Sequence, residues 1–156
     1  MTDLPFPPTD LGAFLQLCDG RWMSLRSVFQ LDGSEDWHSS ERGELVMECV
    51  EGPSDAGPSL EVRNGEGRQL ASMRFAADGA LVLQASQGDQ SGQWQLHGDG
   101  CLELTLPAEA GASLRERIWF TKANLRLRST TLMDRDGTPR QASFCSEIRR
   151  VTAPGS

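Results

Sequence analysis

The fold is decided by one stretch of the chain, Leu114–Met133, which reads LRERIWFTKANLRLRSTTLM. Apolar and polar residues alternate on both sides of residues 122–124, which is the pattern of two neighbouring β-strands. In the second strand Arg126 and Arg128 are two residues apart, so both side chains point to the same face, about 7 Å from each other. Two arginines in that geometry can clamp two carboxylates of one ligand.

Periodicity alone leaves the direction of these faces open. Glu116 shares a face with the leucine, isoleucine and phenylalanine of the first strand, and Cys145 and Glu147 share a face of the last predicted strand. Charged residues that alternate with leucines are most often the solvent side of an ordinary sheet. The same alternation with its charged face turned inward would line a barrel with polar groups, and the residues alone do not choose between the two.

Similar short segments extend backwards from this stretch to the start of a first strand near residue 22. Asp-Gly turn signals separate several of them, at residues 32–33, 78–79, 99–100 and 136–137. Regular spacing with hairpin turns favours an all-β fold, an antiparallel up-and-down β-barrel closed to leave no free strand edge. About ten strands are predicted: Trp22–Leu31, Glu44–Val50, Leu60–Arg63, Gln69–Phe75, Ala80–Gln84, Gly92–Leu96, Cys101–Leu106, Leu114–Thr121, Leu125–Met133 and Gln141–Val151.

The N-terminal part has a different texture. Residues 1–8 are proline-rich and are predicted to form a flexible arm. Thr9 or Asp10 is the predicted N-cap of a short helix, which Asp19-Gly20 ends. One domain is therefore predicted over residues 9–151, followed by a flexible tail over residues 152–156.

Composition excludes several classes of function. A net charge of −7 over 156 residues argues against a nucleic-acid surface and disfavours anionic membranes. The chain has no apolar run of about 18 residues, and its first residues lack the features of a signal peptide, so a cytoplasmic protein is expected. The four cysteines, at positions 18, 49, 101 and 145, are isolated, which predicts reduced, mostly buried thiols and no metal site.

Three linked motifs in the C-terminal third resemble those of the S/U-type phycobiliprotein lyases, the CpcS/CpeS family. They are ERIWF at 116–120, NLRLRST at 124–130 and ASFCSEIR at 142–149. A helix followed by Gly20-Arg21-Trp22 and Arg26 is also similar, and Gly-x-Trp after a helix is similar to the start of a lipocalin barrel. The resemblance covers roughly residues 10–151.

The resemblance implies a lipocalin-like barrel that binds a linear tetrapyrrole, a phycobilin such as phycocyanobilin or phycoerythrobilin. The bilin would be the substrate rather than a cofactor, attached through a thioether to a cysteine of a phycobiliprotein α or β subunit in a cyanobacterial-type host. The matching positions imply that Glu116 and Glu147 face the pyrrole nitrogens as catalytic carboxylates. The implied substrate-binding residues are Arg26, Arg126, Arg128 and Thr130. An aromatic contact from the central region is not placed, with Phe75 and Trp94 as candidates.

In this reading the attacking thiol belongs to the acceptor protein, so the lyase need only bind, orient and polarise the bilin. The alternative is a non-catalytic bilin chaperone or carrier, or the partner subunit of a heteromeric lyase. A lipocalin-like carrier of fatty acids is a more distant reading, because a greasy ligand needs no pair of arginines on one face. A homodimer, or a heterodimer with a paralogous lyase, is a further possibility that the sequence leaves open.

Overall fold

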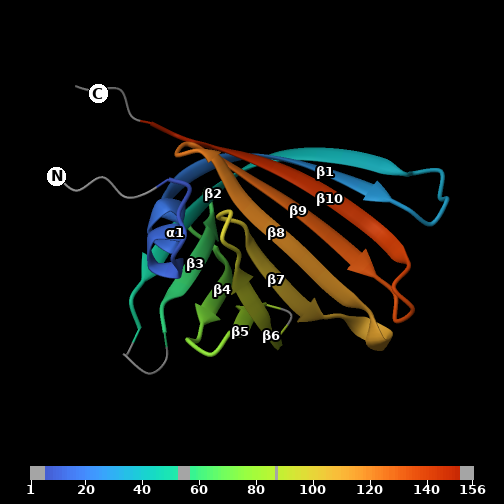
Figure 1. Ribbon diagram of the computed structural model, residues 1–156. Helices are drawn as coiled ribbons and strands as arrows, with labels where there is room; N and C mark the ends of the chain where they lie inside the picture. Colours follow the sequence, from blue (N-terminus) through green and yellow to red (C-terminus); the bar gives the residue numbers. More distant parts are fainter. Residues whose placement is uncertain (1–5, 53–56, 87, 152–156) are drawn as a thin grey trace.

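The computed structural model describes residues 6–52, 57–86 and 88–151. Within these ranges ten antiparallel strands, each paired with its neighbours along the chain, close into a barrel in which β1 meets β10 (Figure 1). The expected all-β, up-and-down barrel with a short N-terminal helix is confirmed. The elements are α1 (Leu11–Cys18), β1 (Gly20–Gln30), β2 (His38–Val50), β3 (Ser59–Asn64), β4 (Gln69–Phe75), β5 (Ala80–Ala85), β6 (Gly88–Leu96), β7 (Leu102–Pro107), the 3₁₀ turn η1 (Glu109–Gly111), β8 (Ser113–Lys122), β9 (Leu125–Met133) and β10 (Pro139–Arg149).

Two strands begin four or more residues earlier than the sequence pattern predicts. β2 starts at His38 rather than Glu44, because its polar first half completes the ladder with β1 as far as Phe29. β6 starts at Gly88 rather than Gly92, and it pairs with the end of β5. Both added segments are rich in polar residues and glycine, so pairing with a neighbouring strand outweighs their weak intrinsic preference for β-structure.

The four Asp-Gly signals lie in connections between consecutive strands, as predicted. Gly137 and Gly79 have φ of +88° and +94°, a region that residues with a Cβ rarely adopt. In the turn before β10 the Asp136 side chain also accepts a hydrogen bond of 3.0 Å from the backbone N–H of Thr138. These turns fix the register of the flanking strands.

Helix α1 covers one end of the barrel. Asp10 is its N-cap and accepts a hydrogen bond of 2.9 Å from the backbone N–H of Ala13, as predicted. The helix buries Phe14 completely, and this ring lies edge-on to Phe120 with centroids 5.2 Å apart. Burying one such side chain contributes about 2–3 kcal/mol. The indole N–H of Trp22 donates to the carbonyl of Cys18 over 2.8 Å, which ties the helix to the first strand.

Arg149, near the end of β10, fastens this helix from the other side. Its guanidinium donates hydrogen bonds to the carbonyls of Leu17 and Asp19, where α1 ends, and one of 3.0 Å to the Asn124 side chain. It also lies over the Trp22 ring, 4.2 Å from the centroid. A cation at a helix C-terminus satisfies carbonyls that have no partner within the helix. The helix is thereby joined to the first and last strands together.

The ends of the chain and the cysteines were also predicted from the sequence. Most of the predicted arm and the tail, at residues 1–5 and 152–156, lie outside the described residues, and Pro8 is buried. All four cysteines are free; Cys18 and Cys145 are buried, whereas Cys49 and Cys101 are only half-buried, so the expected burial holds for two of them. No helix in the described part of the chain is long and apolar enough to span a membrane.

Candidate binding site

The inner faces of β8, β9 and β10 form one polar wall of the barrel. Glu147 on β10 stands opposite Arg126 on β9, in the row next to the helix-covered end, and Cys145 stands opposite Arg128 one row further on. Glu116 on β8 belongs to the row after that. The even-numbered face of residues 124–130 therefore looks into the barrel, which settles the direction that periodicity leaves open.

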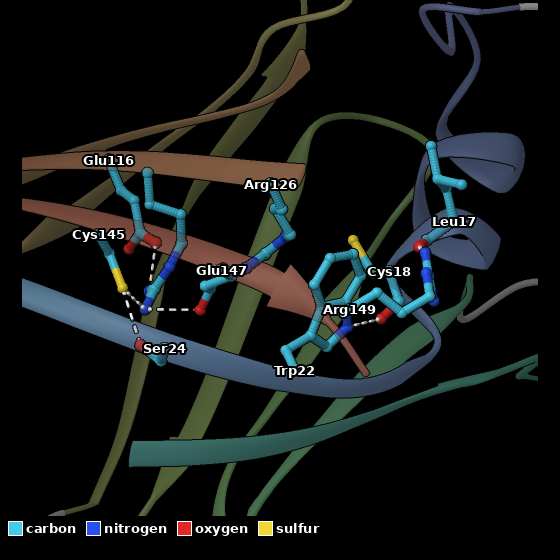
Figure 2. A network of polar contacts seen from close by, with 10 residues as sticks. Leu17, Cys18, Trp22, Ser24, Glu116, Arg126, Cys145, Glu147 and Arg149 are labelled. Carbon is cyan, nitrogen blue, oxygen red and sulfur yellow. Dashed lines mark hydrogen bonds and ion pairs between the residues drawn. The ribbon is translucent and has the colours of Figure 1, made fainter. Parts of the chain in front are cut away.

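Four charged side chains on this wall form a continuous chain of alternating sign (Figure 2). Arg126 donates to one carboxylate oxygen of Glu147. The other oxygen of Glu147 lies 3.2 Å from an Nη2 nitrogen of Arg128, close enough for an ion pair. Arg128 in turn donates a hydrogen bond of 2.9 Å to Glu116. The order is Arg126, Glu147, Arg128, Glu116, and the formal charge of the group sums to zero.

The two side chains nearer the helix end are more deeply buried than the other two. The side chains of Glu147 and Arg126 are 0% and 2% exposed, whereas those of Glu116 and Arg128 are 15% and 24% exposed. Burial acts to lower the pKa of Arg128, but the carboxylates of Glu116 and Glu147 outweigh it and raise that pKa above its ordinary value. Arg128 is thus a permanent cation in a partly dry site.

The network leaves hydrogen-bonding capacity unused. Within the described residues the buried Nε atoms of Arg126 and Arg128 find no acceptor, and one oxygen of Glu147 finds no aligned donor. Buried polar groups are almost always satisfied in folded proteins, so these unpaired atoms are exceptions. Because the atoms are themselves buried, they lie within the wall and not on the surface that faces a ligand.

A cavity of about 730 Å³ adjoins this wall, within the size range of small-molecule sites. Its polar side is formed by Ser24, Arg26, Glu116, Arg126 and Arg128. The rest of the lining is mixed: an aliphatic part includes Met47, Val62, Met73, Leu83, Leu104 and Leu106, and a second polar part includes Glu41, Arg42, Glu44, Asn64 and Glu66. A ligand with an apolar body and acidic groups placed against the arginines matches this arrangement.

The structure brings four of the six predicted site residues to the cavity. Glu116, Arg26, Arg126 and Arg128 line it, whereas Glu147 and Thr130 do not. Glu147 lies behind the two arginines, which differs from the expected direct contact with a ligand. Thr130 is half-buried on β9.

Neither aromatic candidate of the central region lines the cavity. Phe75 is buried in the core, with its ring edge-on to Trp94 at a centroid distance of 6.1 Å. The Trp94 indole N–H donates to the Ala76 carbonyl over 2.8 Å. Both rings therefore have structural partners outside the cavity.

Sequence reasoning misses Ser24, and it describes Cys145 only as a buried thiol on the face of Glu147. The Ser24 hydroxyl and the Cys145 thiol are 3.0 Å apart, and the same thiol lies 3.5 Å from Arg128. Only the alternation of β1, continued inward from Trp22, could have pointed to Ser24. The aliphatic wall is missed as well, because leucines that line a cavity have the same pattern as leucines that fill a core.

The chain is similar in sequence to proteins of one family. The sequence model of one family, described as CpeS-like protein, matches residues 85–150. The chain is 48% identical over 149 residues to chromophore lyase CpcS/CpeS 1 of Paulinella chromatophora, covering 94% of this chain and 92% of that protein. It is 32% identical over 151 residues to chromophore lyase CpcS/CpeS of Thermosynechococcus vestitus, covering 92% and 72%.

Among solved structures, the barrel is similar to the S-type phycobiliprotein lyase CPES from Guillardia theta, with a TM-score of 0.64 and 19% identity. That match covers 92% of this chain and 94% of the other. At this identity the likeness shows a shared fold.

Proposed function

This chain belongs to the CpcS/CpeS family of chromophore lyases, and we propose that its barrel binds a bilin and presents it for thioether attachment to a cysteine of a phycobiliprotein subunit. One observation carries the proposal for the site. Arg126 and Arg128 share one wall of a cavity whose lining also has a large aliphatic part.

The ligand's chemistry matches the two sides of the cavity. A bilin is a long conjugated chain of four pyrrole-type rings that carries two propionates. Arg126 and Arg128 are the proposed anchors of those propionates, because a guanidinium is suited to a carboxylate and stays charged when partly buried. The aliphatic lining contacts the edges of the bilin rings and excludes water from the oxidisable conjugated system.

In the proposed reaction this chain forms no covalent bond itself. The acceptor's thiolate adds to the side chain of ring A, forming one C–S bond while the adjacent carbon takes a proton. Glu116 lies on the cavity wall, where a carboxylate beside the pyrrole nitrogens stabilises the protonated and more electrophilic bilin. Glu147 acts on the ligand from behind, through the two arginines.

The proposal extends to further contacts and partners. Arg26 lines the cavity and is the proposed contact of the first strand, and Thr130 the proposed contact further along β9. Phycocyanobilin or phycoerythrobilin is the proposed substrate, with an α or β phycobiliprotein subunit as the acceptor. Action in the cytoplasm, and association with a second copy or with a paralogous lyase, complete the proposal.

A transfer assay tests the proposed function. Purified protein is mixed with phycocyanobilin and then with an apo-phycobiliprotein subunit, and colour is followed through denaturation in acid urea. Acid-stable colour on the acceptor, lost when the acceptor's target cysteine is replaced by serine, is the expected result. A spectral shift without transfer would instead indicate a chaperone, and the absence of any shift would exclude both.

A matched pair of variants tests the anchors in the same assay. Arg128→Gln removes a cation that lines the cavity, and Arg117→Gln removes one on the outer face of β8 that pairs with Glu103 at 3.0 Å. We expect weaker bilin binding in the first variant and unchanged binding in the second. Equal affinity in both would show that Arg128 does not anchor the bilin.

A further inference from the structure

The two glutamates of the polar wall occupy different places, although the sequence pattern treats them alike. Glu116 lines the cavity and makes one hydrogen bond, to Arg128. Glu147 has no solvent exposure, does not line the cavity, and lies one row nearer the helix-covered end than Arg128. A ligand in the cavity can therefore reach Glu116, while the arginines stand between it and Glu147.

Glu147 joins the two arginines. One of its oxygens accepts from Arg126 and the other lies 3.2 Å from Arg128. No other acidic group in the described residues is within ion-pair distance of Arg126. Two guanidinium groups on adjacent rows repel each other in a poorly hydrated site, and a carboxylate between them offsets that repulsion and fixes their spacing.

The partners of Glu147 also limit where it can go. Its own strand places it opposite both Ser24 on β1 and Arg126 on β9, inside the continuous β1-β10-β9 sheet. If the Glu147 side chain left this position, Arg126 would remain buried without a counter-charge. Glu116 has no such constraint, since its one arginine partner also faces the cavity.

We propose that Glu147 is a positioning residue: it holds Arg126 and Arg128 as a fixed pair spaced for a ligand with two carboxylates, and it does not touch the ligand. Glu116 is then the exchangeable partner, which gives up Arg128 to an incoming carboxylate and turns to the rings. The inference rests on the proposed function, because it takes the ligand to be a bilin with two propionates.

Esterified bilin separates this role from direct contact. Phycocyanobilin and its dimethyl ester share the same rings, but the ester has no carboxylates for the arginines to hold. We expect Glu147→Gln to weaken binding of the free acid about tenfold or more, with the ester's affinity and the bound bilin's absorption spectrum unchanged. Glu116→Gln is the matched control, and should keep the preference for the free acid while altering the spectrum.

A second variant guards against misfolding, because Glu147→Gln leaves Arg126 buried without a counter-ion. Arg126→Gln combined with Glu147→Gln removes both charges of the buried pair and should fold, with circular dichroism as the check. It should lose most of the preference for the free acid, because only Arg128 remains to hold a propionate, and it should bind the ester as the parent does. Ester binding weakened in step with the acid, or a shifted spectrum, in either variant would show that Glu147 contacts the rings and would overturn the inference. If the parent itself binds acid and ester equally, the arginine anchors of the proposed function are wrong, and the inference falls with them.

Discussion

Arg126 and Glu147 form an ion pair whose two side chains are 2% and 0% exposed to solvent. Breaking such a pair leaves one charge buried without a partner, at a cost of about 3–5 kcal/mol. We therefore expect Arg126→Gln to lower the free energy of unfolding by about that amount in urea denaturation. Adding Glu147→Gln should restore part of the loss, because no lone charge then remains. Arg117→Gln on the outer face should cost less than about 1 kcal/mol. Equal losses for Arg117 and Arg126 would contradict the importance of burial.

Glu116→Gln should separate binding from attachment. The variant removes the carboxylate that competes with a propionate for Arg128, so bilin affinity should be unchanged or higher. Attachment should slow by roughly a hundredfold, because a charge that stabilises the polarised bilin is lost. The measurement is the rate of acid-stable colour formation on the acceptor at saturating bilin. A rate within about twofold of the parent would remove Glu116 from the reaction.

Arg149→Ala should loosen helix α1 from the barrel. The change removes hydrogen bonds to Leu17 and Asp19 and the contact with the Trp22 ring, so we expect a loss of about 2–3 kcal/mol in unfolding free energy. Arg150→Ala is the matched control at the next position. Arg150 has an exposed side chain and pairs with Glu44 at 2.8 Å, and its loss should cost less than about 1 kcal/mol. Similar losses in the two variants would argue against the role of Arg149 at the helix end.

Cys18 gives a prediction for alkaline pH. Burial raises the pKa of its thiol above the ordinary value of 9.0, because the charged form is poorly solvated beneath α1. Above pH 9 the unfolded chain loses this proton first, so stability falls as pH rises through that range. The slope for Cys18 alone approaches about 1.4 kcal/mol per pH unit and should be absent in Cys18→Ala. Native protein should also be alkylated more slowly by iodoacetamide at Cys18 than at the half-buried Cys49. Equal alkylation rates would show that the helix end opens readily.

The barrel could be predicted from the sequence because its signals are local. Alternation in Leu114–Met133 and the Asp-Gly turns define strands and hairpins without reference to distant residues, and the N-cap at Asp10 defines the helix. The starts of β2 and β6 could not be predicted in this way. Their segments form strands only because β1 and β5 offer partners for pairing.

The site could be predicted only in part, because a period of two gives the members of a face and not its direction. The family resemblance supplied that direction for Arg126 and Arg128, and the structure agrees with it. Neither the periodicity nor the family resemblance predicts how far each glutamate lies from the cavity. Glu116 and Glu147 have the same alternation and the same kind of motif, and only the closed barrel shows that arginines separate one of them from the cavity.

The closure of β1 on β10 has a consequence for the order of synthesis. The first strand leaves the ribosome long before β10, its neighbour in the closed barrel. A nascent chain that stops before β10 has the aliphatic lining and both arginines, but it lacks Glu147 between them and Arg149 at the helix. The arginine pair thus gains its buried counter-charge only when the last strand to be made pairs with the first.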